Sequence, residues 1–171
     1  MTPTPVRLVE YWLFRSARMQ DAYYTASRDF DRRHLWLGIP SIVFSAVVGT
    51  TVFASLSKNA DVLIQLGAGV LSVSAAILTT LQTFLKYSDL SEKHRTAGVK
   101  FAHLRHSIEL IQVFPPDSAD ELRSRLTEVE VMWDKIRQDS PTLPPRLWRS
   151  VSESLTFEQF LAQDPLAESD A

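Results

Sequence analysis

The sequence predicts an all-α membrane protein, in which two transmembrane helices form a hairpin and amphipathic cytoplasmic helices form a bundle or a coiled coil. Residues 35–56 and 62–85 contain no Asp, Glu, Lys, Arg or His, whereas charged residues are frequent elsewhere. Each run is long enough for a hydrocarbon core about 30 Å thick, which requires about 20 helical residues. A helix of a small soluble domain normally carries a polar face, and neither run has a charged one. The average composition, with 45% hydrophobic residues and a net charge of -2, hides this partition.

The first segment, residues 1–34, is predicted to be a cytoplasmic amphipathic helix. Between residues 5 and 33, apolar side chains recur at a loose helical spacing and form one stripe, which consists of Leu8, Trp12, Met19, Ala22, Ala26 and Phe30. This spacing predicts that one face of the helix packs against another element. Three arginines, Arg28, Arg32 and Arg33, precede the first apolar run.

The two apolar runs form the predicted transmembrane hairpin, residues 35–85, with the polar segment 57–61 as its turn. Basic residues flank both outer ends of the hairpin, whereas the turn contains only Lys58, which Asp61 offsets. By the positive-inside rule, both termini are cytoplasmic and the turn is external. Because the connection is short, the helices are expected to be antiparallel neighbours. Arg32, Arg33 and Lys86 are expected to contact anionic lipid headgroups at the inner interface.

Small and polar residues interrupt both apolar runs along one side. Placed at helical spacing, they form a stripe on each helix, consisting of Gln65, Ser72, Thr79 and Thr83 on the second and Gly38, Ser41, Ser45 and Gly49 on the first. Two interpretations remain open. The stripes pack the hairpin on itself, since small residues let backbones approach closely in lipid, or they line a water-filled path made by several copies of the chain. Pro40 removes one backbone donor and can kink the first helix.

Residues 86–139 are predicted to form a cytoplasmic helical hairpin. Apolar positions recur at alternating spacings of four and three, a coiled-coil pattern formed by Leu90, His94, Ala97, Phe101, Leu104, Ile108 and Ile111. Pro115 and Pro116 end this helix, and Ser118 with Glu121 predicts a capping box at the start of the next. The pattern then continues with Leu122, Leu126, Val129, Trp133 and Ile136. An intramolecular bundle and a seam between subunits have the same spacing, so both remain open.

The last segment, residues 140–171, is predicted to be a proline-interrupted tail. The stretch SPTLPPRLWRS cannot be one regular element, residues 156–162 predict a short helix, and the acidic end DPLAESDA is expected to be disordered.

The residues give little basis for catalysis, and no enzyme activity, cofactor, metal site or nucleic-acid partner is predicted. The chain contains no cysteine, which excludes disulfides, thiolate catalysis and sulfur-ligated metals. His103, His106 and Glu109 are spaced three apart, but they lack the carboxylate pattern of a known metal site. Neither a glycine-rich phosphate loop nor a nucleophile motif is found.

Several short motifs occur in order between residues 15 and 115: Gly38-Ile39-Pro40, Val48-Gly49-Thr50, Leu81-Gln82-Thr83-Phe84, Glu92-Lys93-His94-Arg95 and Leu104-Arg105. Together they resemble the SLATT family, the two-transmembrane effector domains associated with SMODS nucleotidyltransferases and SLOG sensors. The resemblance implies a homo-oligomeric, pore-forming effector in the bacterial inner membrane, which stops an infected cell when a nucleotide second messenger is made or sensed.

The resemblance also implies a partner. The tail after Glu109 is too short for a fused sensor domain, so the signal is expected to come from a nucleotidyltransferase or nucleotide-sensor partner, or through a site made by the helices. The alternative function is a membrane-anchored scaffold, whose cytoplasmic helices recruit a partner protein. In both cases Leu90, Phe101, Leu104 and Ile108 are expected to form the cytoplasmic seam.

Overall fold

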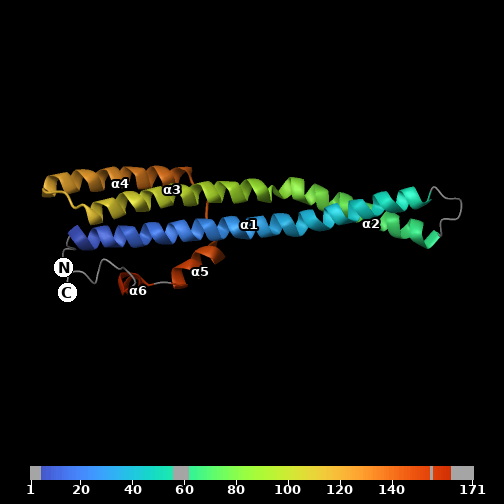
Figure 1. The fold of residues 1–171 in the computed structure, drawn as a ribbon, viewed down its shortest axis with the longest axis horizontal. Helices are drawn as coiled ribbons and strands as arrows, with labels where there is room; N and C mark the ends of the chain where they lie inside the picture. The colour runs from blue at the N-terminus through green and yellow to red at the C-terminus, as the bar shows by residue number, and fades with distance from the viewer. Residues whose placement is uncertain (1–4, 56–61, 155, 163–171) are drawn as a thin grey trace. The chain divides into compact units, whose positions relative to one another are not determined.

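The computed structural model describes residues 5–55, 62–154 and 156–162, and within these ranges every regular element is an α-helix (Figure 1). The helices are α1 (Pro5–Ser55), α2 (Val62–Leu85), α3 (Tyr87–Val113), α4 (Ala119–Asp139), α5 (Pro145–Ser154) and α6 (Phe157–Ala162). The predicted turn 57–61 and the whole acidic stretch 164–171, which was expected to be disordered, lie outside the described residues.

Helix α1 contains both the predicted amphipathic segment and the first apolar run. Pro40 lies inside this helix and does not interrupt it. A proline within a helix removes one hydrogen bond, and an apolar helix that lies against a neighbour tolerates this loss. Helix α2 begins where the second apolar run begins and ends with it, at Leu85.

The chain divides into two units. The first consists of Met1–Ser27 with Glu92–Ala171, and the second consists of Arg28–Ser91. Helices α1 and α3 each contribute residues to both units.

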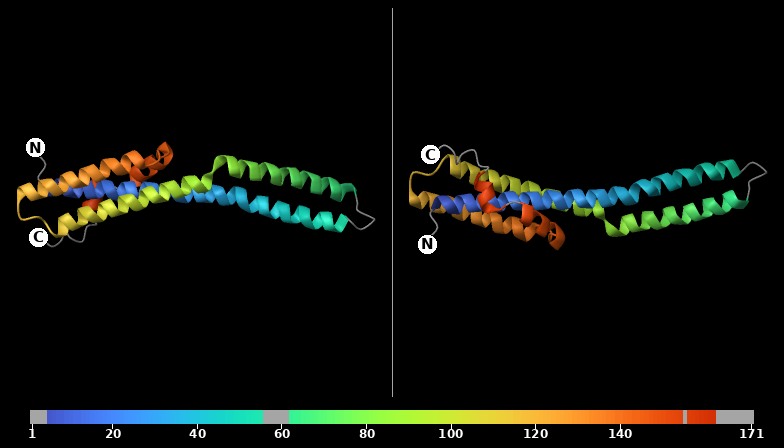
Figure 2. Two further views of the ribbon diagram at one scale, coloured as in Figure 1. Left: turned by 90° about the horizontal axis from the view of Figure 1, so that it is seen from above. Right: turned by 90° about the horizontal axis from the view of Figure 1, so that it is seen from below.

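The first unit is a bundle in which α1, α3 and α4 surround one apolar core. In Figures 1 and 2 these three helices lie side by side in every view. The core consists of Val9, Leu13 and Tyr23 from α1, Ala97, Phe101, Leu104 and Ile108 from α3, and Val129 and Ile136 from α4. Phe101 is at its centre, with its ring centroid 5.4 Å from Tyr23 in a stacked arrangement and 5.5 Å from Trp133 in a T-shaped one.

The coiled-coil spacing of α3 therefore corresponds to an intramolecular core in this unit. Phe101, Leu104 and Ile108 are completely buried by α1 and α4. Leu90 is only half-buried and belongs to the second unit. The capping prediction for α4 is confirmed at its N-cap, because the Glu121 backbone N–H donates to the Ser118 hydroxyl at 3.1 Å.

The apolar stripe predicted on the first segment was too narrow. Ala22 and Ala26 are buried, and Trp12 and Met19 are half-buried and pack against the core. The stripe omitted four further buried residues, Val9, Leu13, Phe14 and Tyr23. The apolar face of α1 is wider than one stripe, because α3 and α4 cover one side and the C-terminal helices cover another.

Helices α5 and α6 return to α1 through aromatic and cationic contacts. The Phe157 ring is 5.7 Å from Tyr11 and 5.4 Å from Phe14, and the Arg18 guanidinium lies 5.3 Å from the Trp148 ring. The proline-interrupted connector is shorter than expected, since α5 begins at Pro145. Proline is favourable at the first position of a helix, where its missing N–H would be unpaired anyway.

Candidate functional site: a groove in the apolar helix pair

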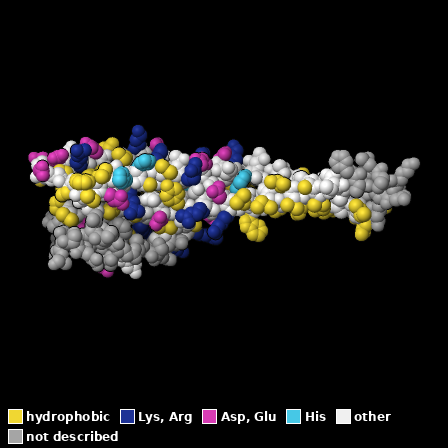
Figure 3. Space-filling model, in the orientation of Figure 1, with side chains coloured by type: hydrophobic (Ala, Val, Ile, Leu, Met, Phe, Trp, Pro, Cys, Tyr) yellow, Lys and Arg dark blue, Asp and Glu magenta, His cyan; other side chains and the backbone are white. Residues whose placement is uncertain are grey.

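The apolar parts of α1 and α2 are not covered by protein. In each helix, only 6% of the most apolar 18-residue window is buried. Leu63 and Phe84 are 77% and 81% exposed, and hydrophobic side chains run along this part of the surface in Figure 3. The core helix of a soluble protein would be mostly buried. Both helices are long and apolar enough to cross a membrane.

Within the second unit, α2 contacts the later part of α1 through small and polar residues. The Ser41 hydroxyl is 2.6 Å from the Thr79 hydroxyl, and Thr79 donates to the Ala75 carbonyl at 2.9 Å. One turn further along α2, the Gln82 amide nitrogen lies 3.4 Å from Nδ1 of His34, which is about two turns before Ser41 on α1. The earlier residue on α1 contacts the later residue on α2, so the two helices run antiparallel here, as Figure 2 shows.

An open groove of about 900 Å³ lies beside this contact. Its lining comes from both helices and is dominated by small and hydroxyl-bearing residues: Ser45, Val48 and Gly49 from α1, with Ser72, Ala75, Ala76, Thr79, Thr80, Thr83 and Phe84 from α2. A smaller hollow of about 330 Å³ includes Gln65, Ala68 and Ser72. We call these two hollows together the helix-pair groove.

The structure brings most of the predicted stripe residues to this groove. Gln65, Ser72, Thr79, Thr83, Ser45 and Gly49 all line it. Ser41 is different, because it is buried between the helices and forms their polar contact. Ser41 and Thr79 thus hold the pair together, whereas Gln65 and Ser72 are exposed along the groove.

The threonine hydroxyls of the groove donate hydrogen bonds to backbone carbonyls of α2 itself. Thr83 donates to the Thr79 carbonyl at 3.0 Å, and Thr80 donates to the Ala76 carbonyl at 2.8 Å. Such bonds to the preceding turn let a hydroxyl exist in hydrocarbon without a water or protein partner. The groove is therefore compatible with lipid contact as well as with water.

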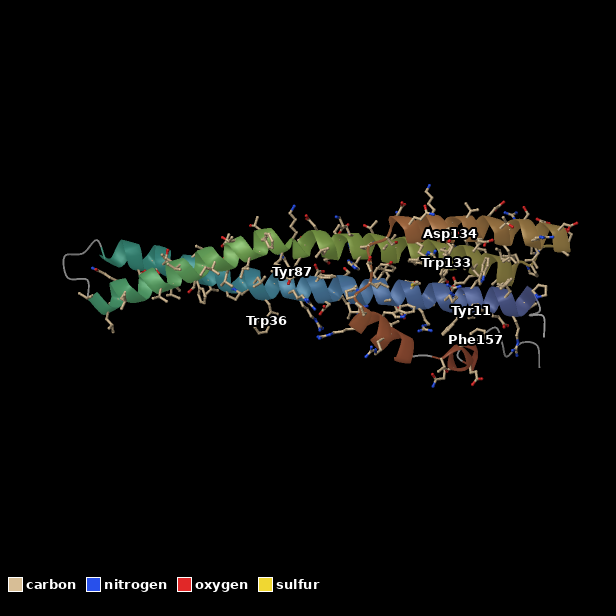
Figure 4. The ribbon with its side chains drawn as sticks, turned by 180° about the vertical axis from the view of Figure 1, so that it is seen from behind. Tyr11, Trp36, Tyr87, Trp133, Asp134 and Phe157 are labelled. Atoms are coloured by element: carbon tan, nitrogen blue, oxygen red, sulfur yellow. The ribbon has the colours of Figure 1, made fainter. Side chains whose placement is uncertain are left out.

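The residues predicted to contact lipid headgroups are exposed at one end of the helix pair. Arg32 and Arg33 are both exposed, and Arg33 forms an ion pair with Asp29 at 2.7 Å. Trp36 is 80% exposed and projects from α1 in Figure 4, while the Tyr87 ring lies 6.0 Å from Phe30. Amphipathic aromatic rings and arginines are typical of a membrane–water interface.

Sequence patterns missed two features of this unit. The first is the pairing of His34 with Gln82, which the antiparallel register could have suggested. The second is Lys86, which has φ of 46° and separates α2 from α3. The local sequence Leu85-Lys86-Tyr87 contains neither glycine nor proline, so no sequence signal marks this break.

Titratable groups with shifted pKa values lie in the first unit. Burial raises the pKa of the Tyr23 phenol, whose hydroxyl donates to the Pro141 carbonyl at 3.1 Å. The hydrogen bonds from Arg95 lower the pKa of Glu92, which is fully exposed. Among the described residues, no three His, Asp or Glu side chains are grouped as they would be around a metal ion.

These features define an all-helical protein with two helices that are long and apolar enough to span a membrane. Residues 14–141, more than half of the chain, match the family described as Mobilome CxxCx(11)CxxC protein, and the chain belongs to this family. No curated protein and no solved structure matches the chain.

The chain departs from the cysteine pattern in the family's description. Two CxxC pairs at a fixed separation are typical of a site in which four thiolates bind zinc. This sequence contains no cysteine, and its described residues offer no cluster of other ligands. The residues present therefore do not fit such a centre.

Proposed function

We propose that this protein is a pore-forming effector of the bacterial inner membrane, activated through a nucleotide second messenger in a conflict with phage. The observation that carries the proposal is the helix-pair groove, a surface of small and hydroxyl-bearing side chains on a helix pair whose remaining surface is apolar and uncovered. The resemblance to the SLATT family supplies the expected trigger and outcome.

Two helices cannot enclose a path for ions, so the effector acts as a homo-oligomer. In the active assembly the helix-pair grooves of several copies face a common axis, and the exposed Gln65 and Ser72 side chains contact water there. In the resting state the same grooves face lipid or other helices. The internal hydrogen bonds of Thr80 and Thr83 make both states accessible, because these hydroxyls need no new partner in either one.

In this proposal the first unit lies in the cytoplasm and the segment 57–61 lies outside. Arg32, Arg33 and Lys86 then contact anionic headgroups at the inner surface, with Trp36 at the same level. A reporter inserted into residues 57–61 should be accessible from outside, and reporters at both termini should be cytoplasmic. A cytoplasmic reporter at 57–61 would contradict the topology.

A scaffold function is the second candidate, and the contact between Ser41 and Thr79 favours it. That contact uses two polar side chains to pack α1 against α2, as a simple membrane anchor would. A scaffold would use the first unit to recruit a partner, and its apolar helices would conduct nothing.

The deciding experiment compares two adjacent substitutions in α2 during induced expression in bacteria. Ser72 lines both hollows of the groove, whereas Val73 lines neither and is 61% exposed. Ser72→Phe should dry or block the path and abolish loss of membrane potential, because hydrophobic constrictions gate by dewetting. Val73→Phe should depolarise the membrane as the unmodified protein does.

Thr79 is a poorer position for this test, because its hydroxyl also contacts Ser41 and a large side chain would separate the helices. Equal depolarisation by the two phenylalanine variants, at matched amounts in the membrane, would reject the groove as the path. Unchanged potential with the unmodified protein, together with intact binding of a nucleotidyltransferase or sensor partner, would favour the scaffold.

A further inference from the structure

A second groove, of about 620 Å³, lies in the first unit between the end of α3 and the larger part of α4. Pro115 and Pro116 line it from the segment that joins the two helices. Along α4 it extends from Glu121 to Met132, which is about 16 Å at the rise of an α-helix. We call it the α3–α4 groove.

The α3–α4 groove has a mixed lining, in which apolar side chains that the bundle leaves uncovered lie beside polar and charged ones. Leu110 is 47% exposed, Met132 is 41% exposed and Phe114 is 73% exposed, while the buried Val129 forms the base. Other apolar residues of the same helices, such as Phe101, Leu104 and Val129, belong to the buried core. A cluster of large exposed apolar side chains that line one groove is typical of a protein–protein contact.

The rim of the groove is acidic. Asp117, Glu121 and Glu128 lie on it with one cation, Arg125, and three carboxylates against one guanidinium leave a net charge of -2. Arg125 is 3.9 Å from Glu121, so its charge is already shared with that carboxylate. Figure 3 shows acidic and hydrophobic side chains next to each other at the end of the unit where α3 leads into α4.

This combination selects one kind of occupant. A negative rim repels anionic lipid headgroups and nucleic-acid phosphates. A groove between two helices that is about three turns long and has exposed apolar side chains along it accepts the apolar face of a third helix. Lysine and arginine beside that face would meet Asp117 and Glu128 across the rim.

We propose that the α3–α4 groove binds a basic amphipathic helix of a partner protein. The inference does not depend on pore formation, since the groove belongs to the first unit and uses none of the helix-pair residues. Apolar contacts with Leu110, Phe114 and Met132 supply most of the affinity, and the acidic rim selects the sign of the partner's charge.

The test uses the full-length protein in non-ionic detergent and a fluorescent peptide of leucine and lysine. The peptide has about 14 residues, with apolar positions at i, i+3, i+4 and i+7. At a rise of about 1.5 Å per residue its helix is longer than the groove, so it can fill the whole groove. A second peptide has glutamate at each lysine position. The lysine peptide should bind at least about tenfold more tightly than the glutamate peptide, and added salt should reduce the difference.

Three variants locate the binding site. Leu110→Asp should weaken binding of the lysine peptide by about tenfold or more, because it places a charge in the apolar wall. Glu128→Lys should weaken binding of the lysine peptide several-fold. It should also reduce the difference in affinity between the lysine peptide and the glutamate peptide. Val131→Asp is the matched control, since Val131 is 65% exposed on α4 but does not line the groove, and binding should not change.

Equal affinity for the two peptides, after subtraction of binding to empty micelles, would overturn the proposal. So would equal weakening by Leu110→Asp and Val131→Asp. A change in oligomer size on Leu110→Asp, measured by sedimentation, would show that a second copy of the chain occupies the groove instead of a partner.

Discussion

Replacement of a lysine by glycine should have opposite effects on stability at two positions of this chain. Lys86 has φ of 46°, in the left-handed region, and is the one non-glycine residue with a positive φ in the part of the chain that the structure describes. Lys93 lies inside α3, is exposed and has the same side chain. A comparison of the two variants therefore separates the effect of the backbone conformation at residue 86 on stability from the effect of losing a lysine side chain.

The expected magnitudes follow from the two conformations. A left-handed conformation costs an L-residue about 1–2 kcal/mol, and the extra flexibility of glycine in the unfolded chain costs about 0.5–1 kcal/mol. Lys86→Gly should therefore stabilise the folded state by about 0.5–1 kcal/mol. Lys93→Gly should destabilise it by about 1 kcal/mol, because glycine is the poorer helix former and no strain is relieved.

The assay is thermal unfolding of the two variants in the same detergent, followed by far-ultraviolet circular dichroism. The free-energy difference of about 1.5–2 kcal/mol between the variants corresponds to about 3–8 °C in the midpoint for a chain of this size. A lower midpoint for both variants, by similar amounts, would mean that residue 86 is helical and that α2 and α3 are one continuous helix.

Two further predictions concern packing and pH. Gly98→Ala should destabilise the first unit by up to about 2 kcal/mol, because a Cβ there would lie 3.1 Å from the Tyr24 ring and the crowding outweighs the gain of about 1 kcal/mol from alanine in a helix. Gly38→Ala should be neutral or stabilising by less than about 1 kcal/mol in the same unfolding assay, since the atom it meets at 3.0 Å is the movable amide end of Gln82. The pKa of Tyr23 is raised by burial, so its ionisation opposes folding and the free energy of unfolding should fall as the pH rises above 10.0. Tyr23→Phe should remove part of that fall, and an identical pH dependence would show that Tyr23 does not contribute.

Much of the helical architecture could be predicted because it depends on local patterns. The limits of α2 coincide with an uncharged run, and the start of α4 follows from the side chain of Ser118. The burial of Phe101, Leu104 and Ile108 agrees with the spacing of apolar residues along α3. Each of these predictions rests on a pattern of residues within a few turns of one another in the chain.

The sequence could predict which residues belong to the candidate site, but not how they are arranged. Helical spacing identified Ser41, Ser45, Thr79 and Thr83 as members of stripes, but it could not assign their neighbours. The structure buries Ser41 against Thr79 and places Ser45 and Thr83 along the groove. The register between α1 and α2 decides this difference, and the register depends on both helices at once.

The sequence by itself determined that the chain is helical and that two of its segments are long and apolar enough to cross a membrane, because hydrophobicity and periodicity are local properties. Only the tertiary structure decided the break at Lys86, the wide buried face of α1 and the exposed α3–α4 groove. The buried face of α1 depends on contacts between residues far apart in the chain, such as Phe157 with Phe14, and the groove depends on how α3 packs against α4. Tertiary packing overrides a local preference where the packing energy exceeds the cost of an unfavourable backbone conformation, which is about 1–2 kcal/mol for a left-handed residue.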